Sequence, residues 1–299
     1  MKRPQEMTSV QPDWENFYPR PISDKIPFFS RDGRLYDCLF AQQLSRELLE
    51  HLFKTADALR TITQRKSGAD HIGNLLSDKR AMLYFVQPST RTFMSFLNAA
   101  HILGVKTSEI RDTSTSSEVK GETPEDTVRT FSSYVDMIIM RHPAPGFVEK
   151  TAWLMNRTGR PVPIVNGGSG KDQHPTQALL DAYTLYRSFE GERDTTHRVM
   201  VGALTRGRTV RSLSYLMKNY KNVSLSFVSP KEFRMEADIL DFLKRHNIPF
   251  QETEDFKGVM KSADAIYMTR IQDEHDKSGE SKGVDYSPFY FRQENLKDI

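Results

Sequence analysis

The four residues Ser89-Thr90-Arg91-Thr92 have the side chains needed to bind a phosphate group. They follow the apolar run 82–86, which is typical of a buried strand, and precede apolar residues at the spacing of one helix face. A helix beginning here would have Ser89 as its N-cap and would direct free backbone N–H groups at an anion. Arg91 could bind two phosphate oxygens at once. The stretch therefore predicts a phosphate site, although a capped helix without a ligand accounts for these four residues equally well.

Two later apolar runs also end in residues that suit an anion. Run 137–140 is followed by Arg141, and run 163–166 is followed, after a glycine-rich turn, by His174 and Pro175. Because expected strands and helices alternate, we predict a parallel sheet, whose strands end at one shared edge where ligands bind. The three groups of polar and cationic side chains should therefore be neighbours in space.

The same alternation returns in the second half of the chain and sets the expected domain organisation. We predict an α/β fold of two doubly wound domains, each a parallel sheet flanked by helices. The first 33 residues contain five of the 15 prolines, which rules out a long helix there. The expected units are a proline-rich arm over 1–33, a first domain over 34–190 and a second domain over 191–299.

Further polar residues in this second half and in one loop could contact a ligand. Arg208 precedes a helix, and the expected last strand, 265–268, leads to Arg270 and Gln272. The Ser- and Thr-rich stretch 112–121 contains Ser116 and Lys120. Such a loop is either simply solvated or closes over an anionic ligand, and its sequence leaves both interpretations open.

The overall charge is close to balanced and excludes some classes of partner. There are 42 Lys and Arg against 39 Asp and Glu, a formal net charge of +3, which does not favour nucleic acid or an anionic membrane as the main partner. No apolar run approaches the length of a membrane span, and we expect no secretory signal. The single cysteine, Cys38, excludes an internal disulfide framework and a cysteine-based metal site, and it favours the cytoplasm.

Five motifs together resemble the catalytic chains of aspartate carbamoyltransferases, in the aspartate/ornithine carbamoyltransferase superfamily. The resemblance covers about residues 35–299, in the order and spacing of the family. The motifs are Ser89-Thr90-Arg91-Thr92, Arg141-His142-Pro143, His174-Pro175-Thr176-Gln177-Ala178-Leu179-Leu180-Asp181, Gly207-Arg208-Thr209-Val210 and Met268-Thr269-Arg270-Ile271-Gln272.

The resemblance implies roles for particular residues. It implies carbamoyl phosphate binding by Ser89, Thr90, Arg91, Thr92, Arg141, His174 and Gln177. Within that set, Thr92, Arg141 and His174 would face the carbonyl oxygen, and Gln177 would contact the amino group. Arg208, Arg270 and Gln272 would bind aspartate. Ser116 and Lys120 would reach into the site of a neighbouring subunit, which implies a homotrimer with shared active sites.

The implied reaction attaches the carbamoyl group to the amino group of L-aspartate and releases phosphate, in pyrimidine biosynthesis. It needs no metal and no cofactor. Its developing oxyanion needs donors already in place, and losing one such donor costs about 3 kcal/mol of barrier. The resemblance leaves open whether a regulatory chain or a partner enzyme also binds.

The sequence departs from the family at several charged positions. The family usually has Glu at the position of Gln87, Arg at Phe93 and Asp at Ser169, with Asp and Lys around Ala203 and Thr205. These charges largely orient the arginines and link the domains, so the substitutions bear on both properties.

The family also continues beyond the position of the last residue with a strand, a His-Pro-Leu-Pro-Arg loop and a long helix. On the resemblance, the chain is therefore expected to be C-terminally incomplete. Three functions stay open: an aspartate carbamoyltransferase, a transcarbamoylase for another amino acid, or a non-catalytic paralogue that binds carbamoyl phosphate.

Overall fold

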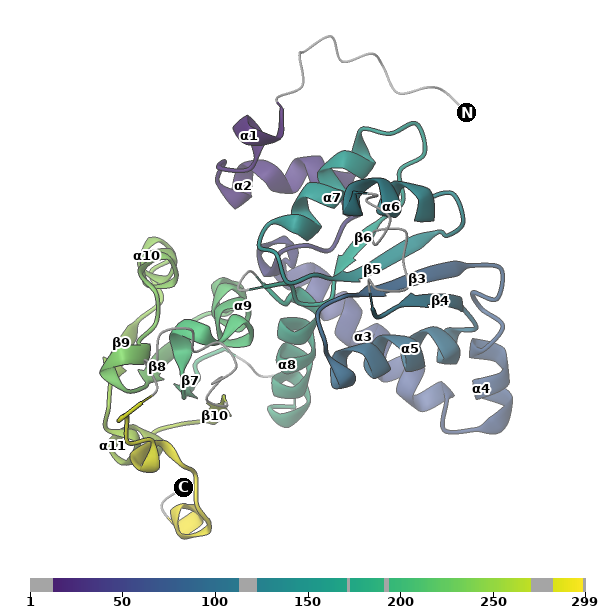
Figure 1. Ribbon diagram of the computed structural model, residues 1–299. Coiled ribbons are helices and arrows are strands. Elements are labelled where there is room, and N and C mark those ends of the chain that lie inside the picture. The colour runs from purple at the N-terminus through teal and green to yellow at the C-terminus, as the bar shows by residue number, and fades with distance from the viewer. Residues whose placement is uncertain (1–12, 113–122, 171–172, 191–193, 270–281, 298–299) are drawn as a thin grey trace.

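Two four-stranded parallel β-sheets, each flanked by helices, form the main body of the part of the protein that the structure describes (Figure 1). The computed structural model describes residues 13–112, 123–170, 173–190, 194–269 and 282–297. The predicted α/β fold with two parallel sheets is confirmed. No helix within these ranges is long and apolar enough to cross a membrane.

The first sheet has the strand order β4-β3-β5-β6. Its strands are β3 (Arg80–Phe85), β4 (Lys106–Ile110), β5 (Met137–Arg141) and β6 (Ile164–Asn166). The central strands β3 and β5 are almost entirely buried, as their apolar runs predicted. The polar edge strand β4 was not predicted, because its sequence, Lys-Thr-Ser-Glu-Ile, has no apolar run and most of its side chains are exposed.

In this half of the chain, the residue types of Thr123 and Pro175 predict helix starts and that of Gly104 predicts a helix end, and the structure has helix boundaries at all three. They are α3 (Arg46–Ile62), α4 (Lys66–Ile72), α5 (Thr90–Leu103), α6 (Pro124–Phe131), α7 (Phe147–Asn156) and α8 (Pro175–Ser188). Gly104 ends α5 with a φ of 78°, a conformation that glycine adopts without strain. The apolar pattern from Ala41 to about Gln64 predicts one helix, but the structure divides this stretch. A 3₁₀ turn, η2 (Ala41–Gln43), precedes α3, whose N-cap Ser45 accepts the backbone N–H of Leu48.

The second sheet has the strand order β10-β7-β8-β9 and is also parallel. Its strands are β7 (His197–Val201), β8 (Ser224–Val228), β9 (Phe250–Thr253) and β10 (Ala265–Met268). Its helices are α9 (Arg208–Leu216), α10 (Ala237–Arg245) and α11 (Phe256–Met260). The apolar residues at 248–250 predict a strand, whereas β9 begins at Phe250, directly after Pro249, which has no backbone N–H to donate to a sheet.

Helix α8 lies between the two halves of the chain in Figure 1 and joins their cores. Its buried residues Ala178 and Ala182 belong to one hydrophobic cluster with Phe53 of α3, Leu213 of α9 and Phe227 of β8. The first turns of α8 therefore pack between α3 of the first half and α9 and β8 of the second, which is where a ligand bridging two halves would bind.

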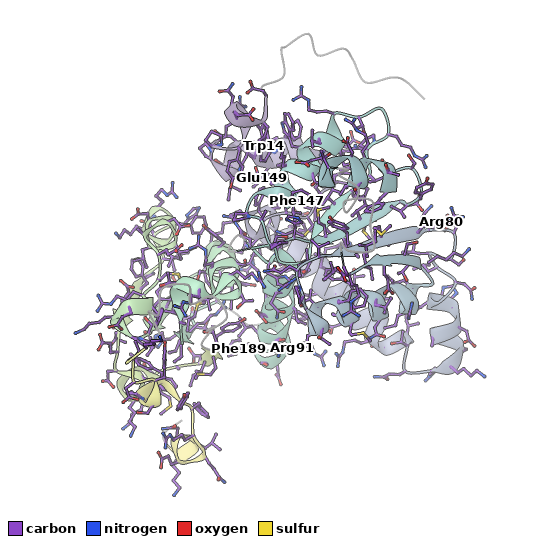
Figure 2. All side chains as sticks on the ribbon, in the orientation of Figure 1. Trp14, Arg80, Arg91, Phe147, Glu149 and Phe189 are labelled. Atoms are coloured by element: carbon purple, nitrogen blue, oxygen red, sulfur yellow. The ribbon has the colours of Figure 1, made fainter. Side chains whose placement is uncertain are left out.

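The described part of the N-terminal segment folds into short elements that pack on α7. These are α1 (Trp14–Phe17), α2 (Ile22–Lys25), the 3₁₀ turn η1 (Ile26–Phe29) and the hairpin of β1 (Ser30–Arg31) and β2 (Arg34–Leu35). The ring of Trp14 lies 5.7 Å from that of Trp153, and Figure 2 shows Trp14 close to Glu149. Lys25 forms a buried ion pair with Glu149 at 2.6 Å. The sequence left open either a disordered tail or an arm whose aromatic residues pack onto the protein, and the described part of the segment packs onto it.

Candidate functional site

The carboxyl ends of three neighbouring strands bring most of the described candidate residues together. Phe85, at the end of β3, pairs in register with Arg141, and Met140 of β5 pairs with Asn166 at the end of β6. The backbone N–H of Gln87 donates to the carbonyl of Arg141 at 3.3 Å. The residues that follow β3, β5 and β6 therefore surround one edge of the first sheet.

Arg141 is a buried cation with an unused donor. Its side chain is part of a residue only 6% exposed, and Nη1 donates to the carbonyl oxygen of Gly167 at 3.2 Å. Its Nε atom is buried, and no described group accepts a hydrogen bond from it. Burial, and then the positive charge of Arg208, lowers the pKa of Arg141 to about 9. A buried guanidinium with an unsatisfied N–H is unfavourable, and an anion would relieve both conditions.

His174 is held as a neutral imidazole with its free N–H directed at Thr92. Its Nδ1 accepts the backbone N–H of Gln177 at 3.3 Å, which assigns the ring proton to Nε2. Nε2 lies 3.4 Å from the Thr92 hydroxyl. Burial, followed by the charges of Arg141 and Arg208, lowers the pKa of His174 to about 3. At neutral pH the ring is therefore an uncharged hydrogen-bond donor.

The turn after β6 needs glycine at position 168. Gly168 has a φ of 91°. A Cβ atom there would lie 2.4 Å from Cδ2 of His174 and 2.9 Å from Nη1 of Arg141. The side chains of His174 and Arg141 thus pack directly against the backbone of Gly168, and any side chain at this position would displace them.

Arg208, the first residue of α9, reaches back to the first sheet. Its Nη1 lies 2.6 Å from the carbonyl oxygen of Gly170 and 3.4 Å from Oε1 of Gln87. Gln87 stands where the family usually has Glu, so a neutral amide holds this arginine from a similar position. Ser169, which replaces the usual Asp, is fully buried and accepts the backbone N–H of His142 at 3.2 Å.

The remaining described candidates lie at the starts of helices α5 and α8. Ser89 occupies the N-cap position of α5, but its side chain makes no capping hydrogen bond. Thr90 and Arg91 are exposed on the first turn of α5, and Arg91 is labelled in Figure 2. Gln177 lies on the first turn of α8, beside His174. Ser116, Lys120, Arg270 and Gln272 lie outside the described residues.

Three residues that hold the site in place were missed by the sequence reasoning. Ser212 of α9 accepts the backbone N–H of His174 at 2.9 Å. Asp181 of α8 accepts hydrogen bonds from Gln177 and from Tyr267 of β10. Ser212 and Tyr267 gave no local signal. The spacing of Gln177 and Asp181, four residues apart on one helix face, could have indicated their contact.

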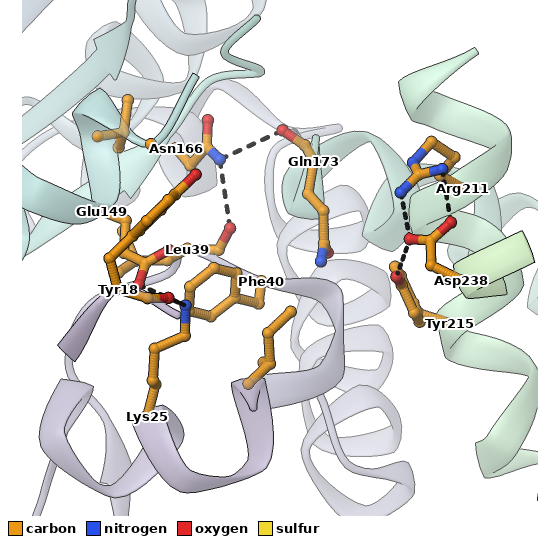
Figure 3. A pocket seen from close by; sticks show the side chains of 13 residues that line it. Tyr18, Lys25, Leu39, Phe40, Glu149, Asn166, Gln173, Arg211, Tyr215 and Asp238 are labelled. Carbon is orange, nitrogen blue, oxygen red and sulfur yellow. Dashed lines mark hydrogen bonds and ion pairs between the residues drawn. The ribbon is translucent and has the colours of Figure 1, made fainter. Parts of the chain in front are cut away.

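A cavity of about 250 Å³ lies elsewhere, between the N-terminal segment, α7 and α9 (Figure 3). None of the candidate site residues lines it. Its charged side chains are already paired: Lys25 with Glu149 at 2.6 Å, and Arg211 with Asp238 in a contact drawn in Figure 3. These walls carry balanced charge, so the cavity is less suited to an anion than the edge with Arg141.

Comparisons with known proteins agree with the chemistry of that edge. The family model described as "Aspartate/ornithine carbamoyltransferase, carbamoyl-P binding domain" matches residues 37–187. A chloroplastic aspartate carbamoyltransferase 1 of Pisum sativum is 40% identical over 256 residues, which are 84% of this chain and 63% of the relative. The aspartate carbamoyltransferase catalytic subunit of Methanosarcina acetivorans is 36% identical over 233 residues, which are 78% of this chain and 72% of the relative.

Solved structures agree as well. Aspartate transcarbamoylase from Trypanosoma cruzi, in complex with carbamoyl phosphate and aspartate, matches with a TM-score of 0.72 and 33% identity, over 82% of this chain and 75% of the other. The chain spans 63% of the length of the pea relative.

Proposed function

The chain belongs to the aspartate/ornithine carbamoyltransferase family, and from this premise we propose that it transfers the carbamoyl group of carbamoyl phosphate to L-aspartate. The products would be N-carbamoyl-L-aspartate and phosphate, in a step of pyrimidine biosynthesis. The observation that carries the proposal is the buried Arg141, whose Nε has no partner among the described residues, beside a neutral His174 whose remaining N–H points into the same region.

In the proposed mechanism the first domain binds carbamoyl phosphate. Ser89, Thr90, Arg91 and Thr92, at the start of α5, hold its phosphate, helped by the positive end of the helix. The carbonyl oxygen lies among Arg141, the Thr92 hydroxyl and Nε2–H of His174. Neutral imidazole suits this role because it donates without competing for the proton of the attacking amine.

The amino group of aspartate then attacks the carbamoyl carbon. The C–N bond forms as the carbonyl electrons move to oxygen, where the prearranged donors stabilise the charge. The oxyanion electrons then re-form the C=O bond as the C–O bond to phosphate breaks, and phosphate leaves with the electron pair of that bond. The leaving phosphate takes the proton that the ammonium nitrogen loses. Holding two anions together in a reactive pose removes much of the entropic barrier. In this scheme Arg208, Arg270 and Gln272 bind the carboxylates of aspartate.

Membership of the family also suggests how the subunits assemble and how the chain divides into domains. We propose a homotrimer in which Ser116 and Lys120 of one subunit complete the site of the next. We also propose the division into an arm over 1–33 and domains over 34–190 and 191–299, with a regulatory chain or partner enzyme as an open question. A single cysteine supports a cytoplasmic location, whereas the pea relative is named as chloroplastic.

Two arginine variants test the assignment. Arg91→Ala should abolish binding of carbamoyl phosphate in calorimetry, whereas Arg270→Ala should leave it unchanged and weaken aspartate binding. The exposed Arg245→Ala, on α10, is the matched control and should change neither. Equal losses for both ligands in both variants would contradict the assignment.

Turnover assays then separate the alternative functions. Formation of carbamoyl aspartate by the purified chain supports the proposal. Product formed only with another amine in a panel of acceptors would instead identify a different transcarbamoylase. Carbamoyl phosphate binding with no turnover on any amine would identify a non-catalytic paralogue.

A further inference from the structure

One carboxylate connects a candidate substrate-binding residue with the second sheet. Oδ1 of Asp181 accepts a hydrogen bond from Nε2 of Gln177 at 2.9 Å, and Oδ2 accepts one from the Tyr267 hydroxyl, also at 2.9 Å. Asp181 and Gln177 belong to α8, whereas Tyr267 belongs to β10, so the contact crosses from one half of the chain to the other. The Thr209 hydroxyl, beside Arg208, also bonds the Tyr267 hydroxyl.

The carboxylate fixes which way the Gln177 amide points. An ionised carboxylate only accepts hydrogen bonds, so the amide must turn its NH₂ group toward Asp181. Its oxygen, Oε1, is then the end left for a ligand. The backbone N–H of Gln177 lies 3.1 Å from the carbonyl oxygen of His174, which places the residue on the same helical turn as the ring. A ligand group that meets the Gln177 side chain beside His174 must therefore be a donor.

The acceptor that Gln177 offers to a ligand complements the hydrogen-bond donors of the other candidate residues. Arg141, Thr92 and the Nε2–H of His174 offer donors to a carbonyl oxygen. A carbamoyl group has a carbonyl oxygen on one side and an NH₂ on the other, so it satisfies both sides at once. An acetyl group has the same size and the same carbonyl oxygen, but its methyl group would leave Oε1 without a partner, which carries a desolvation cost.

We propose that Asp181 is a positioning residue that selects carbamoyl over acetyl phosphate by fixing the orientation of the Gln177 amide. The inference rests on the proposed function, because it assigns the specificity of that same site. Tyr267 and Thr209 hold Asp181 in place from the other half of the chain. Burial raises the pKa of Asp181, while its bonds to Gln177 and Tyr267 oppose that shift.

The test measures the affinities of carbamoyl phosphate, acetyl phosphate and inorganic phosphate by calorimetry. The wild-type protein should prefer carbamoyl over acetyl phosphate. In Asp181→Asn the new amide can donate as well as accept, so Gln177 can rotate, and the preference should fall by about tenfold, the value of one hydrogen bond. The affinity for inorganic phosphate should stay within about twofold, because phosphate does not use the amide.

Further variants distinguish a changed orientation of the Gln177 amide from general destabilisation of the protein. Asp181→Glu keeps an acceptor-only group and should restore most of the preference. Tyr267→Phe keeps the carboxylate but removes one bond that holds it, so it should lower the preference for carbamoyl phosphate less than Asp181→Asn does. Asp241→Asn, on the exposed face of α10, is the matched control. If Asp181→Asn does not fold, Asp181→Ser, which is smaller and also replaces the acceptor-only carboxylate with a group that can donate, provides the same comparison.

The outcomes distinguish failure of the proposed function from failure of the proposed role of Asp181. If the wild-type protein fails to bind carbamoyl phosphate, the proposed function itself is wrong. If it binds, and a folded Asp181→Asn or Asp181→Ser protein keeps the full preference for carbamoyl over acetyl phosphate, the role of Asp181 is overturned. A parallel loss of affinity for all three ligands would equally overturn it, because that result indicates only a structural contribution.

Discussion

Nε2 of His174 lies 3.4 Å from the Thr92 hydroxyl, across 82 residues of sequence. The opposite ring nitrogen accepts the backbone N–H of Gln177, so the same imidazole caps helix α8 and offers its one proton to the site. A histidine used in this way must stay neutral, and its burial beside Arg141 and Arg208 has that effect. Both roles have consequences that can be measured.

The first prediction concerns stability at low pH. The pKa of His174 is about 3 in the folded protein and about 6.5 in the unfolded chain, so between these values the unfolded chain binds the extra proton. Relative to His174→Asn, whose Oδ1 can still cap α8, the wild-type protein should lose up to about 1.4 kcal/mol of unfolding free energy per pH unit as pH falls from 6.5. Urea denaturation of both proteins between pH 4 and 8 measures this difference. A difference independent of pH would contradict a neutral, buried His174.

A second prediction concerns Arg141 as an anion ligand. Arg141→Gln removes the buried guanidinium whose Nε lacks a described partner, and it should weaken carbamoyl phosphate binding by about 100-fold, the value of a charge-assisted hydrogen bond of about 2–3 kcal/mol. The same change should raise the pKa of His174, because one of the two positive charges that lower it is gone. Titration with carbamoyl phosphate by calorimetry and NMR titration of the His174 ring provide the two readouts. Arg129→Gln, an exposed residue of α6, is the control and should match the wild-type protein in both.

The contact between Gln87 and Arg208 leads to a third prediction. Gln87→Glu would convert the 3.4 Å contact to Nη1 of Arg208 into a charge-assisted one, which we expect to raise unfolding free energy by about 1 kcal/mol. It would also remove one net positive charge from the site and so weaken phosphate binding. Thermal denaturation should therefore show a higher melting temperature, whereas phosphate titration should show a lower affinity. Gln87→Met, which has similar length and no charge, should not stabilise the protein.

The fourth prediction concerns the attachment of the N-terminal segment. Lys25 and Glu149 are both buried and 2.6 Å apart, and Lys25 also donates to the carbonyl oxygen of Tyr18. Lys25→Met should destabilise the protein by about 3–5 kcal/mol, because it leaves a buried carboxylate without its cation. Adding Glu149→Leu should recover much of that loss. A double-mutant cycle by urea denaturation measures the coupling, and additive effects would show that the pair does not hold the segment on α7.

Local sequence patterns determined much of the framework around the site. The strands β3 and β5 are almost entirely buried, so consecutive apolar residues marked both of them in the sequence. Thr123 caps α6 by accepting the backbone N–H of Asp126, and Pro175 begins α8, as their residue types predicted. These elements were predictable because a cap, a proline or an apolar run acts on neighbours within about one helical turn.

The division of the expected helix at 41–64 and the polar strand β4 were decided by tertiary packing. So were the bond from His174 to Ser212, across 38 residues, and the bond from Asp181 to Tyr267, across 86. The sequence by itself determined which residues could bind an anion and on which strand ends they lie. Only the tertiary structure decided the proton position on His174 and the direction of the Gln177 amide, because each depends on a partner brought close by the order of the strands and the packing of α8 against α9.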